Sequence, residues 1–134
     1  MREQETGDSN QKKMENKLKS YKDLVVWQKS MDLVVEVYAL VKKLPKEETY
    51  ALSDQMRRSV VSIPSNIAEG YTRNSTVEYL RFLSIANGSR TELETQLIIC
   101  TRIQYLTEKD TEKALAMSDE IGRIIYSIIG RLKK

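Results

Sequence analysis

Apolar side chains recur every three or four residues along most of this chain, and this spacing constrains the fold more than any other feature. From Leu24 the first series continues through Trp27, Met31, Val34 and Tyr38 to Val41. Such spacing places one apolar stripe along an α-helix, whereas a half-buried strand would alternate apolar and polar residues. With only two prolines and five glycines to interrupt it, the chain is predicted to form a few long helices. A β-sandwich is disfavoured.

Four segments of this kind predict an all-α fold, an antiparallel up-down-up-down four-helix bundle, because short connections favour antiparallel neighbours. The bundle is expected to span residues 21–134 as one domain, which suits a chain of 134 residues. Residues 1–20 carry mixed charges and almost no apolar side chains, so they are predicted to be a flexible N-terminal tail.

Helix boundaries follow from local signals. Pro45 is expected to stop the first helix, and the second is expected to begin between residues 46 and 49, with acidic residues in its first turn. Ser75 and Glu78 have the spacing of a capping box for the third helix. Before the last helix, residues 107–110 are predicted to form a turn, with Thr111 taking part in capping.

The first and last helices carry more apolar surface than a single core requires. Beside the stripe from Leu24 to Val41, the first helix has a second apolar stripe, which comprises Val26, Leu33, Val37, Leu40 and Leu44. The last helix also has two apolar stripes, and the second of them comprises Gly122, Ile125, Ile129 and Leu132. An amphipathic helix that covers one core needs only one stripe. We therefore predict self-association with closed rotational symmetry.

The chain contains no histidine, which excludes Ser-His-Asp and Cys-His catalysis and histidine-containing metal sites. We expect no enzyme activity, metal or cofactor; the alternative is a carboxylate pair among Glu69, Glu92 and Glu94 acting as acid and base or holding a cation. The single cysteine, Cys100, is expected to be a core residue. Because neither a signal peptide nor a membrane-spanning apolar run is visible, we expect a cytoplasmic protein.

The segment RSVVSIPSNIAEG (58–70) places Pro64 inside a helical pattern, which predicts a kink in the second helix. Nearby hydroxyl and amide groups can satisfy the backbone there. We predict that this face meets the third helix in a structural polar network, and the alternative is that Asn66 and Glu69 face solvent. The predicted network comprises Ser62, Asn66, Glu69, Ser89, Glu92 and Gln96.

Three stretches together resemble a known family: YKDLVVW (21–27), QMRRSVVSIPSNIAEG (55–70) and YLRFLSIANGSRTELETQL (79–97). They are similar to the four-helix-bundle proteins encoded by intervening sequences in bacterial large-subunit (23S) ribosomal RNA genes. A more distant resemblance is to the accessory protein of diversity-generating retroelements. The resemblance implies a bundle, a homopentameric ring and a ribosomal RNA or retroelement setting, but no defined biochemical role. Leu44 and Ala51 depart from the family's usual aromatic residue and glycine.

Basic residues suggest that such a ring could bind RNA, since Lys and Arg neutralise phosphates. The alternative for the middle helices is that the arginines pair with Asp54, Glu69, Glu78, Glu92 and Glu94. A second hypothesis is a protein-interaction scaffold, for example for a retroelement reverse transcriptase or a ribosomal component. The candidate RNA-binding residues are Arg57, Arg58, Arg73, Arg81, Arg90, Lys12, Lys13, Lys17, Lys19, Lys133 and Lys134, and Tyr71, Tyr79 and Tyr105 are candidates for stacking on bases.

Overall fold

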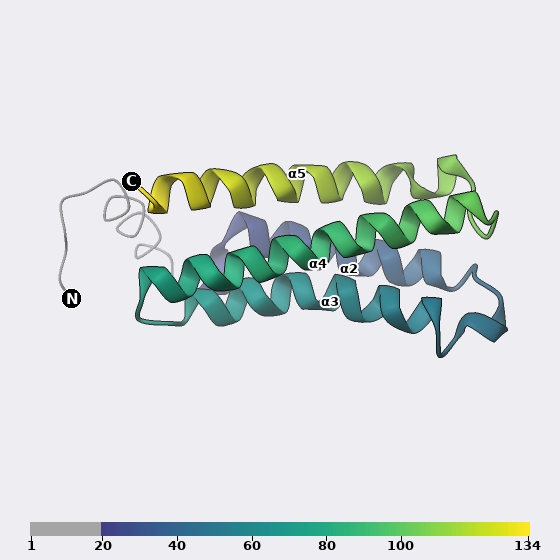
Figure 1. Ribbon diagram of the computed structural model, residues 1–134, viewed down its shortest axis with the longest axis horizontal. Helices are drawn as coiled ribbons and strands as arrows, with labels where there is room; N and C mark the ends of the chain where they lie inside the picture. Colours follow the sequence, from purple (N-terminus) through teal and green to yellow (C-terminus); the bar gives the residue numbers. More distant parts are fainter. Residues whose placement is uncertain (1–19) are drawn as a thin grey trace.

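The computed structural model describes residues 20–134, so apart from Ser20 the predicted tail lies outside the described residues. The main helices are α2 (Val25–Val41), α3 (Leu52–Tyr71), α4 (Thr76–Arg102) and α5 (Glu108–Leu132), and two 3-10 turns, η1 (Tyr21–Asp23) and η2 (Lys46–Glu48), precede α2 and α3. Successive helices run in opposite directions, each packs on the next, and α2 also packs on α5 (Figure 1). The predicted antiparallel up-down-up-down four-helix bundle is confirmed.

Capping side chains fix where the helices start. The Ser75 hydroxyl accepts a hydrogen bond from the backbone N–H of Glu78 at 3.2 Å, which is one half of the predicted capping box. The Glu78 carboxylate accepts from Arg81 instead of completing the other half. At α5 the N-cap is Thr107, which forms a reciprocal capping box with Asp110. Residues 107–110 are therefore the cap and first turn of α5, and Thr111 is a buried residue inside the helix. The prediction that Thr111 takes part in capping was wrong because the Thr107 hydroxyl already accepts the free N–H of Asp110.

The start of α3 lies later than predicted. Residues 46–48 form the 3-10 turn η2, and the α-helix begins only at Leu52. The reason lies in Glu48, whose Oε1 accepts the backbone N–H of Leu52 at 3.2 Å while its Oε2 accepts the Tyr105 hydroxyl at 2.9 Å. Glu48 therefore caps α3 from outside and ties it to the α4–α5 connection.

The core side of α2 is the second of its two predicted stripes. Val26, Leu33 and Val37 are essentially inaccessible to solvent, whereas Met31 and Tyr38 of the first stripe are 40% and 41% exposed. The bundle thus has one core, and α2 keeps part of its apolar surface outside it.

The packing of α3 on α4 positions the polar groups of the segment 58–70. Helix α3 runs without a break through the buried Pro64. Near its end, Gly70 lies so close to α4 that a Cβ added there would be 2.5 Å from the Cβ of Phe82. At the other end of the contact, the Cys100 thiol lies 3.7 Å from the Met56 sulfur. Glycine at position 70 therefore permits the close approach of the two helices.

Candidate nucleic-acid interface

Three of the candidate arginines on α3, α4 and the connection between them form ion pairs on the surface. Arg58 bonds Asp54 at 2.9 Å, Arg73 bonds Glu69 at 2.9 Å and Arg81 bonds Glu78 at 3.1 Å. In each pair the two residues are three or four positions apart in the sequence. The hydrogen bond from Arg81 holds the pKa of the Glu78 carboxyl below its ordinary value, so this pair is charged at neutral pH. These contacts agree with the alternative in which the arginines pair with carboxylates. They agree less well with arginines that are free to bind phosphate.

Two of these guanidinium groups also lie against one aromatic ring. The Cζ atoms of Arg73 and Arg81 are 5.0 Å and 4.6 Å from the centroid of the Phe82 ring. A cation over an aromatic face at this distance is attracted by the ring quadrupole. Salt bridge and stacking together hold both arginines at the α3–α4 connection, with their outer edges still exposed.

Arg90 has a different role from the one predicted. Only 8% of the residue is exposed, and its guanidinium bonds Asn87 Oδ1 at 2.9 Å, Glu94 Oε2 at 2.8 Å and the backbone carbonyl of Ser118 at 3.3 Å. The Ser118 hydroxyl donates to the same Glu94 oxygen at 2.9 Å. Arg90 therefore joins α4 to α5 inside the bundle, and its prediction as a surface phosphate ligand is corrected. Ser118 was missed because nothing in the sequence marks a lone serine as the partner of a buried arginine.

Within residues 20–134, Arg57 makes no ion pair, in contrast to Arg58 beside it. Its side chain is half-buried, and Nη2 donates to the backbone carbonyl of Thr49 at 3.0 Å. Lys133 and Lys134 are exposed after the last turn of α5. Among the remaining candidates, Lys12, Lys13, Lys17 and Lys19 lie outside the described residues.

The predicted polar network forms only in part. The hydroxyl groups of Ser62 and Ser89 are 2.8 Å apart across the α3–α4 contact, and the Asn66 amide donates to the Ser62 carbonyl at 2.8 Å and to its hydroxyl at 2.9 Å. Glu69 points to Arg73 instead. Glu92 is exposed, and Gln96 is buried with its Oε1 unpaired within the described residues. The network therefore contains Ser62, Asn66 and Ser89, but not Glu69, Glu92 or Gln96.

The carboxylates offered as a catalytic alternative do not converge. Glu69 bonds Arg73, Glu94 bonds Arg90 and Ser118, and Glu92 is exposed. Within residues 20–134, no three His, Cys, Asp or Glu side chains are grouped so that they could hold a metal ion. These three carboxylates therefore do not form the acid–base pair considered from the sequence.

The three tyrosines considered for base stacking are held inside the fold or at its edge. Tyr79 has no exposed surface and packs edge-on against Tyr71 at 5.9 Å between ring centroids. Tyr105 donates to Glu48, and that hydrogen bond raises the pKa of the Tyr105 hydroxyl. Stacking on a base would require each of them to leave these contacts.

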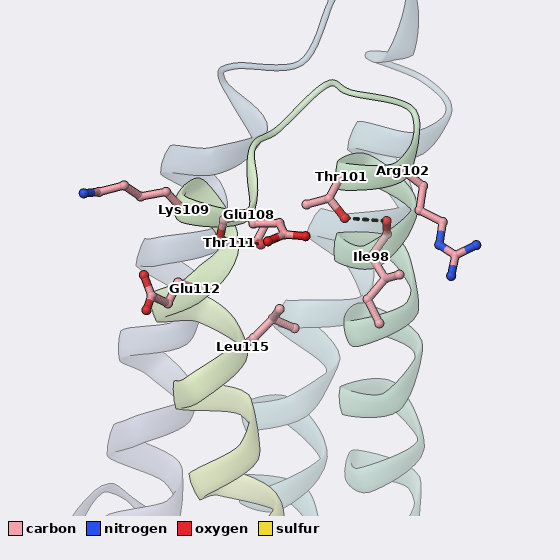
Figure 2. A pocket seen from close by; sticks show the side chains of 8 residues that line it. All are labelled: Ile98, Thr101, Arg102, Glu108, Lys109, Thr111, Glu112 and Leu115. Atoms are coloured by element: carbon pink, nitrogen blue, oxygen red, sulfur yellow. Dashed lines mark hydrogen bonds between the residues drawn. The ribbon is translucent and has the colours of Figure 1, made fainter.

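A groove lies between the end of α4 and the start of α5 (Figure 2). Ile98, Thr101 and Leu115 form its centre. The Thr101 hydroxyl donates a hydrogen bond to the backbone carbonyl of Ile98 in the same helix at 2.8 Å. Its rim has both signs of charge, with Arg102 and Lys109 opposed by Glu108 and Glu112. The mixed rim gives no preference for an anion or a cation.

In the described part of the chain, no helix is long and apolar enough to cross a membrane.

Comparisons with known proteins agree with this architecture. A crystal structure from Bacteroides thetaiotaomicron, described as a protein of unknown function from the S23 ribosomal protein family, is 33% identical with a TM-score of 0.73; the match covers 78% of this chain and 98% of that one. No curated protein matches the chain. The family model described as 23S rRNA-intervening sequence protein matches residues 22–127, which is most of the bundle. The chain therefore belongs to the 23S rRNA-intervening sequence protein family.

Proposed function

We propose that the protein binds RNA as a homo-oligomer and has no catalytic role. The observation that carries this proposal is the basic end of the bundle. Arg131, Lys133 and Lys134 close the chain with no acidic residue after Glu120, and the α3–α4 connection lies at the same end (Figure 1). Arg73 in that connection and Arg81 in the second turn of α4 are exposed, although each is paired with a carboxylate. A phosphate backbone crossing this end would therefore meet the two terminal lysines and the outer edges of these two guanidinium groups.

The family setting supports an RNA partner. The matching family is described by intervening sequences of 23S ribosomal RNA, and the similar crystal structure is assigned to a ribosomal protein family. Both descriptions concern those proteins, and neither names a ligand. The proposal for this chain rests on its own charge distribution.

Self-association is supported by apolar side chains outside the core. On α2, Met31 is 40% and Val35 is 72% exposed, and on α4, Ile98 and Ile99 are 47% and 41% exposed. Exposed apolar residues on several helices are typical of interaction surfaces when they form a patch. We propose the pentameric ring implied by the family resemblance, in which five copies would add weak RNA contacts through avidity. Light scattering that shows a monomer would overturn this part.

The same apolar surfaces favour a second candidate function, a scaffold or accessory factor that binds another protein such as a reverse transcriptase. Co-purification of a partner protein that survives nuclease treatment would favour this candidate. Loss of the partner after nuclease treatment would favour RNA as the bridge.

The experiment for RNA binding is a salt titration with single-stranded RNA, starting near 50 mM. We expect a steep fall in affinity with salt, since each neutralised phosphate of a single strand contributes about 0.7 to the logarithmic slope. The double variant Lys133→Gln/Lys134→Gln should reduce this slope by about 1 to 1.5. The double variant Lys109→Gln/Lys113→Gln, which removes the same charge at the other end of the bundle, is the matched control. Undetectable binding near 50 mM, or a salt-independent affinity, would exclude phosphate neutralisation.

A further inference from the structure

A small pocket lies at the corner where α2 turns into α3. It has a volume of about 340 Å³, and the residues that carry its chemistry are Tyr38, Lys42, Lys46, Ser53 and Arg57. They come from the end of α2, the turn η2 and the first turns of α3. The pocket is therefore built by an ordered part of the fold at the end opposite the C-terminus (Figure 1).

The charge of this pocket is of one sign. Three of its lining residues, Lys42, Lys46 and Arg57, are basic, and no carboxylate lines it. The acidic groups close by in sequence have other partners: Glu48 accepts from Leu52 and Tyr105, and Asp54 bonds Arg58. Glu47 is exposed and is not part of the lining. In contrast to the mixed rim of the α4–α5 groove, this site favours an anion.

Arg57 is positioned to present its charge. One nitrogen of the guanidinium is fixed by the Thr49 carbonyl at 3.0 Å, and an arginine has five N–H donors in a planar fork. The remaining donors suit the oxygens of a phosphate, which arginine binds in a bidentate manner. Ser53 lines the same pocket with 4% of its surface exposed and offers a hydroxyl.

Tyr38 adds an aromatic surface to this cationic pocket. It is 41% exposed although it lines the pocket, and an exposed tyrosine ring can stack on a nucleic-acid base of any sequence. The pocket volume lies at the lower end of the range for small-ligand sites, about 300–1,000 Å³. A ligand of one nucleotide therefore matches both the size and the chemistry.

We propose that this pocket binds one nucleotide unit, with the phosphate on Arg57, Lys42 and Lys46 and the base on Tyr38. If the unit is a residue of RNA, the inference rests on the proposed function and adds a contact at the end of the bundle opposite Lys133 and Lys134. A free nucleotide has the same chemistry, and the experiment must separate the two sources.

The test measures binding of labelled single-stranded RNA, of AMP and of inorganic phosphate by the full chain near 50 mM salt. Lys46→Gln should weaken RNA binding about threefold to tenfold and lower the salt slope by about 0.7, and Tyr38→Leu should weaken it at least fivefold. Lys109→Gln and Tyr50→Leu remove the same groups from exposed positions outside the pocket and should change binding by less than twofold. Unchanged thermal unfolding and light scattering would show that all four variants retain the fold and assembly.

Each outcome separates the two proposals. If the Lys46 and Tyr38 variants bind RNA as wild type while Lys133→Gln/Lys134→Gln does not, the pocket assignment is overturned and the RNA function stands. If wild type binds AMP but no RNA, and Lys46→Gln loses AMP, the pocket is a free-nucleotide site and the RNA function fails. Phosphate binding as strong as AMP binding would remove Tyr38 from the assignment, and no binding of any probe would overturn both proposals.

Discussion

The guanidinium of Arg90 lies directly on Gly122, so close that a Cβ on residue 122 would be 2.6 Å from the Arg90 Cζ atom. The arginine cannot simply move aside, because Asn87, Glu94 and Ser118 all bond its nitrogens. A buried charge that loses such partners is costly. Glycine at this one position of α5 thus makes room for the charged contact between α4 and α5.

We predict that Gly122→Ala lowers the free energy of unfolding by about 1–3 kcal/mol, since overpacking outweighs the better helix propensity of alanine. Chemical denaturation measures this difference. The control is Gly130→Ala on the same helix, where an added Cβ would meet nothing within 4 Å. That variant should be neutral or more stable by up to about 1 kcal/mol. Equal effects of the two substitutions would show that the Arg90 contact imposes no steric requirement.

Asn66 should stabilise the α3–α4 contact through its bonds to Ser62, which in turn contacts Ser89. Pro64 has no N–H to donate to the carbonyl of Val60, so α3 already lacks one backbone hydrogen bond in this region. Asn66→Ala is expected to cost about 1 kcal/mol, the net value of a typical hydrogen bond. Ser65→Ala, at an exposed neighbouring position, is the control. An unchanged melting temperature for Asn66→Ala would indicate that the side chain is effectively solvated.

Cys100 gives the protein an alkaline dependence of stability. Burial, with a smaller contribution from Glu48, raises the pKa of its thiol from 9.0 to about 11. Above pH 9 the unfolded chain releases this proton while the native chain keeps it, so the native state binds more protons. The associated stability is therefore fully present below about pH 9 and is lost as pH rises towards 11, by about 1–2 kcal/mol.

Denaturation curves at pH 8.5 and 10.5 measure that loss, and Cys100→Ala should show a smaller difference between the two pH values than wild type. The native thiol should also resist alkylation at pH 8 and react once the protein is unfolded. Rapid labelling of the native protein would contradict both the burial and the raised pKa.

Much of the fold could be predicted because apolar spacing and caps are local properties of the sequence. The four helices, the Ser75 cap and the pairing of Arg58, Arg73 and Arg81 with nearby carboxylates all involve residues a few positions apart. The start of α3 could not be predicted in this way, because Glu48 is held by Tyr105 from the far connection. The spacing of apolar residues alone also could not decide which of the two α2 stripes faces the core, because that depends on where α3 and α5 lie.

The candidate site was less predictable for the same reason. Arg90 looked like any other arginine in the sequence, and only its packing against Gly122 and Ser118 shows that it is internal. Lys42, Lys46 and Tyr38 were not singled out, although the basic residues on both sides of Pro45 are a local signal that could have found them. Their common pocket with Arg57 depends on how the α2–α3 connection folds.

The contact between α2 and α5 has a kinetic consequence. Helices α3 and α4 are consecutive and share the most extensive contact, whereas α2 and α5 meet across most of the sequence. Closing so long a loop costs more configurational entropy than pairing adjacent helices.

We expect the α3–α4 hairpin to form in the folding transition state and α5 to dock on α2 last. Phi-values for Ile63→Val above those for Ile125→Val would support this order, and the reverse would refute it. Local unfolding of the bundle would then begin at the contact between α2 and α5. At that contact, two copies of the chain would most readily exchange their terminal helices.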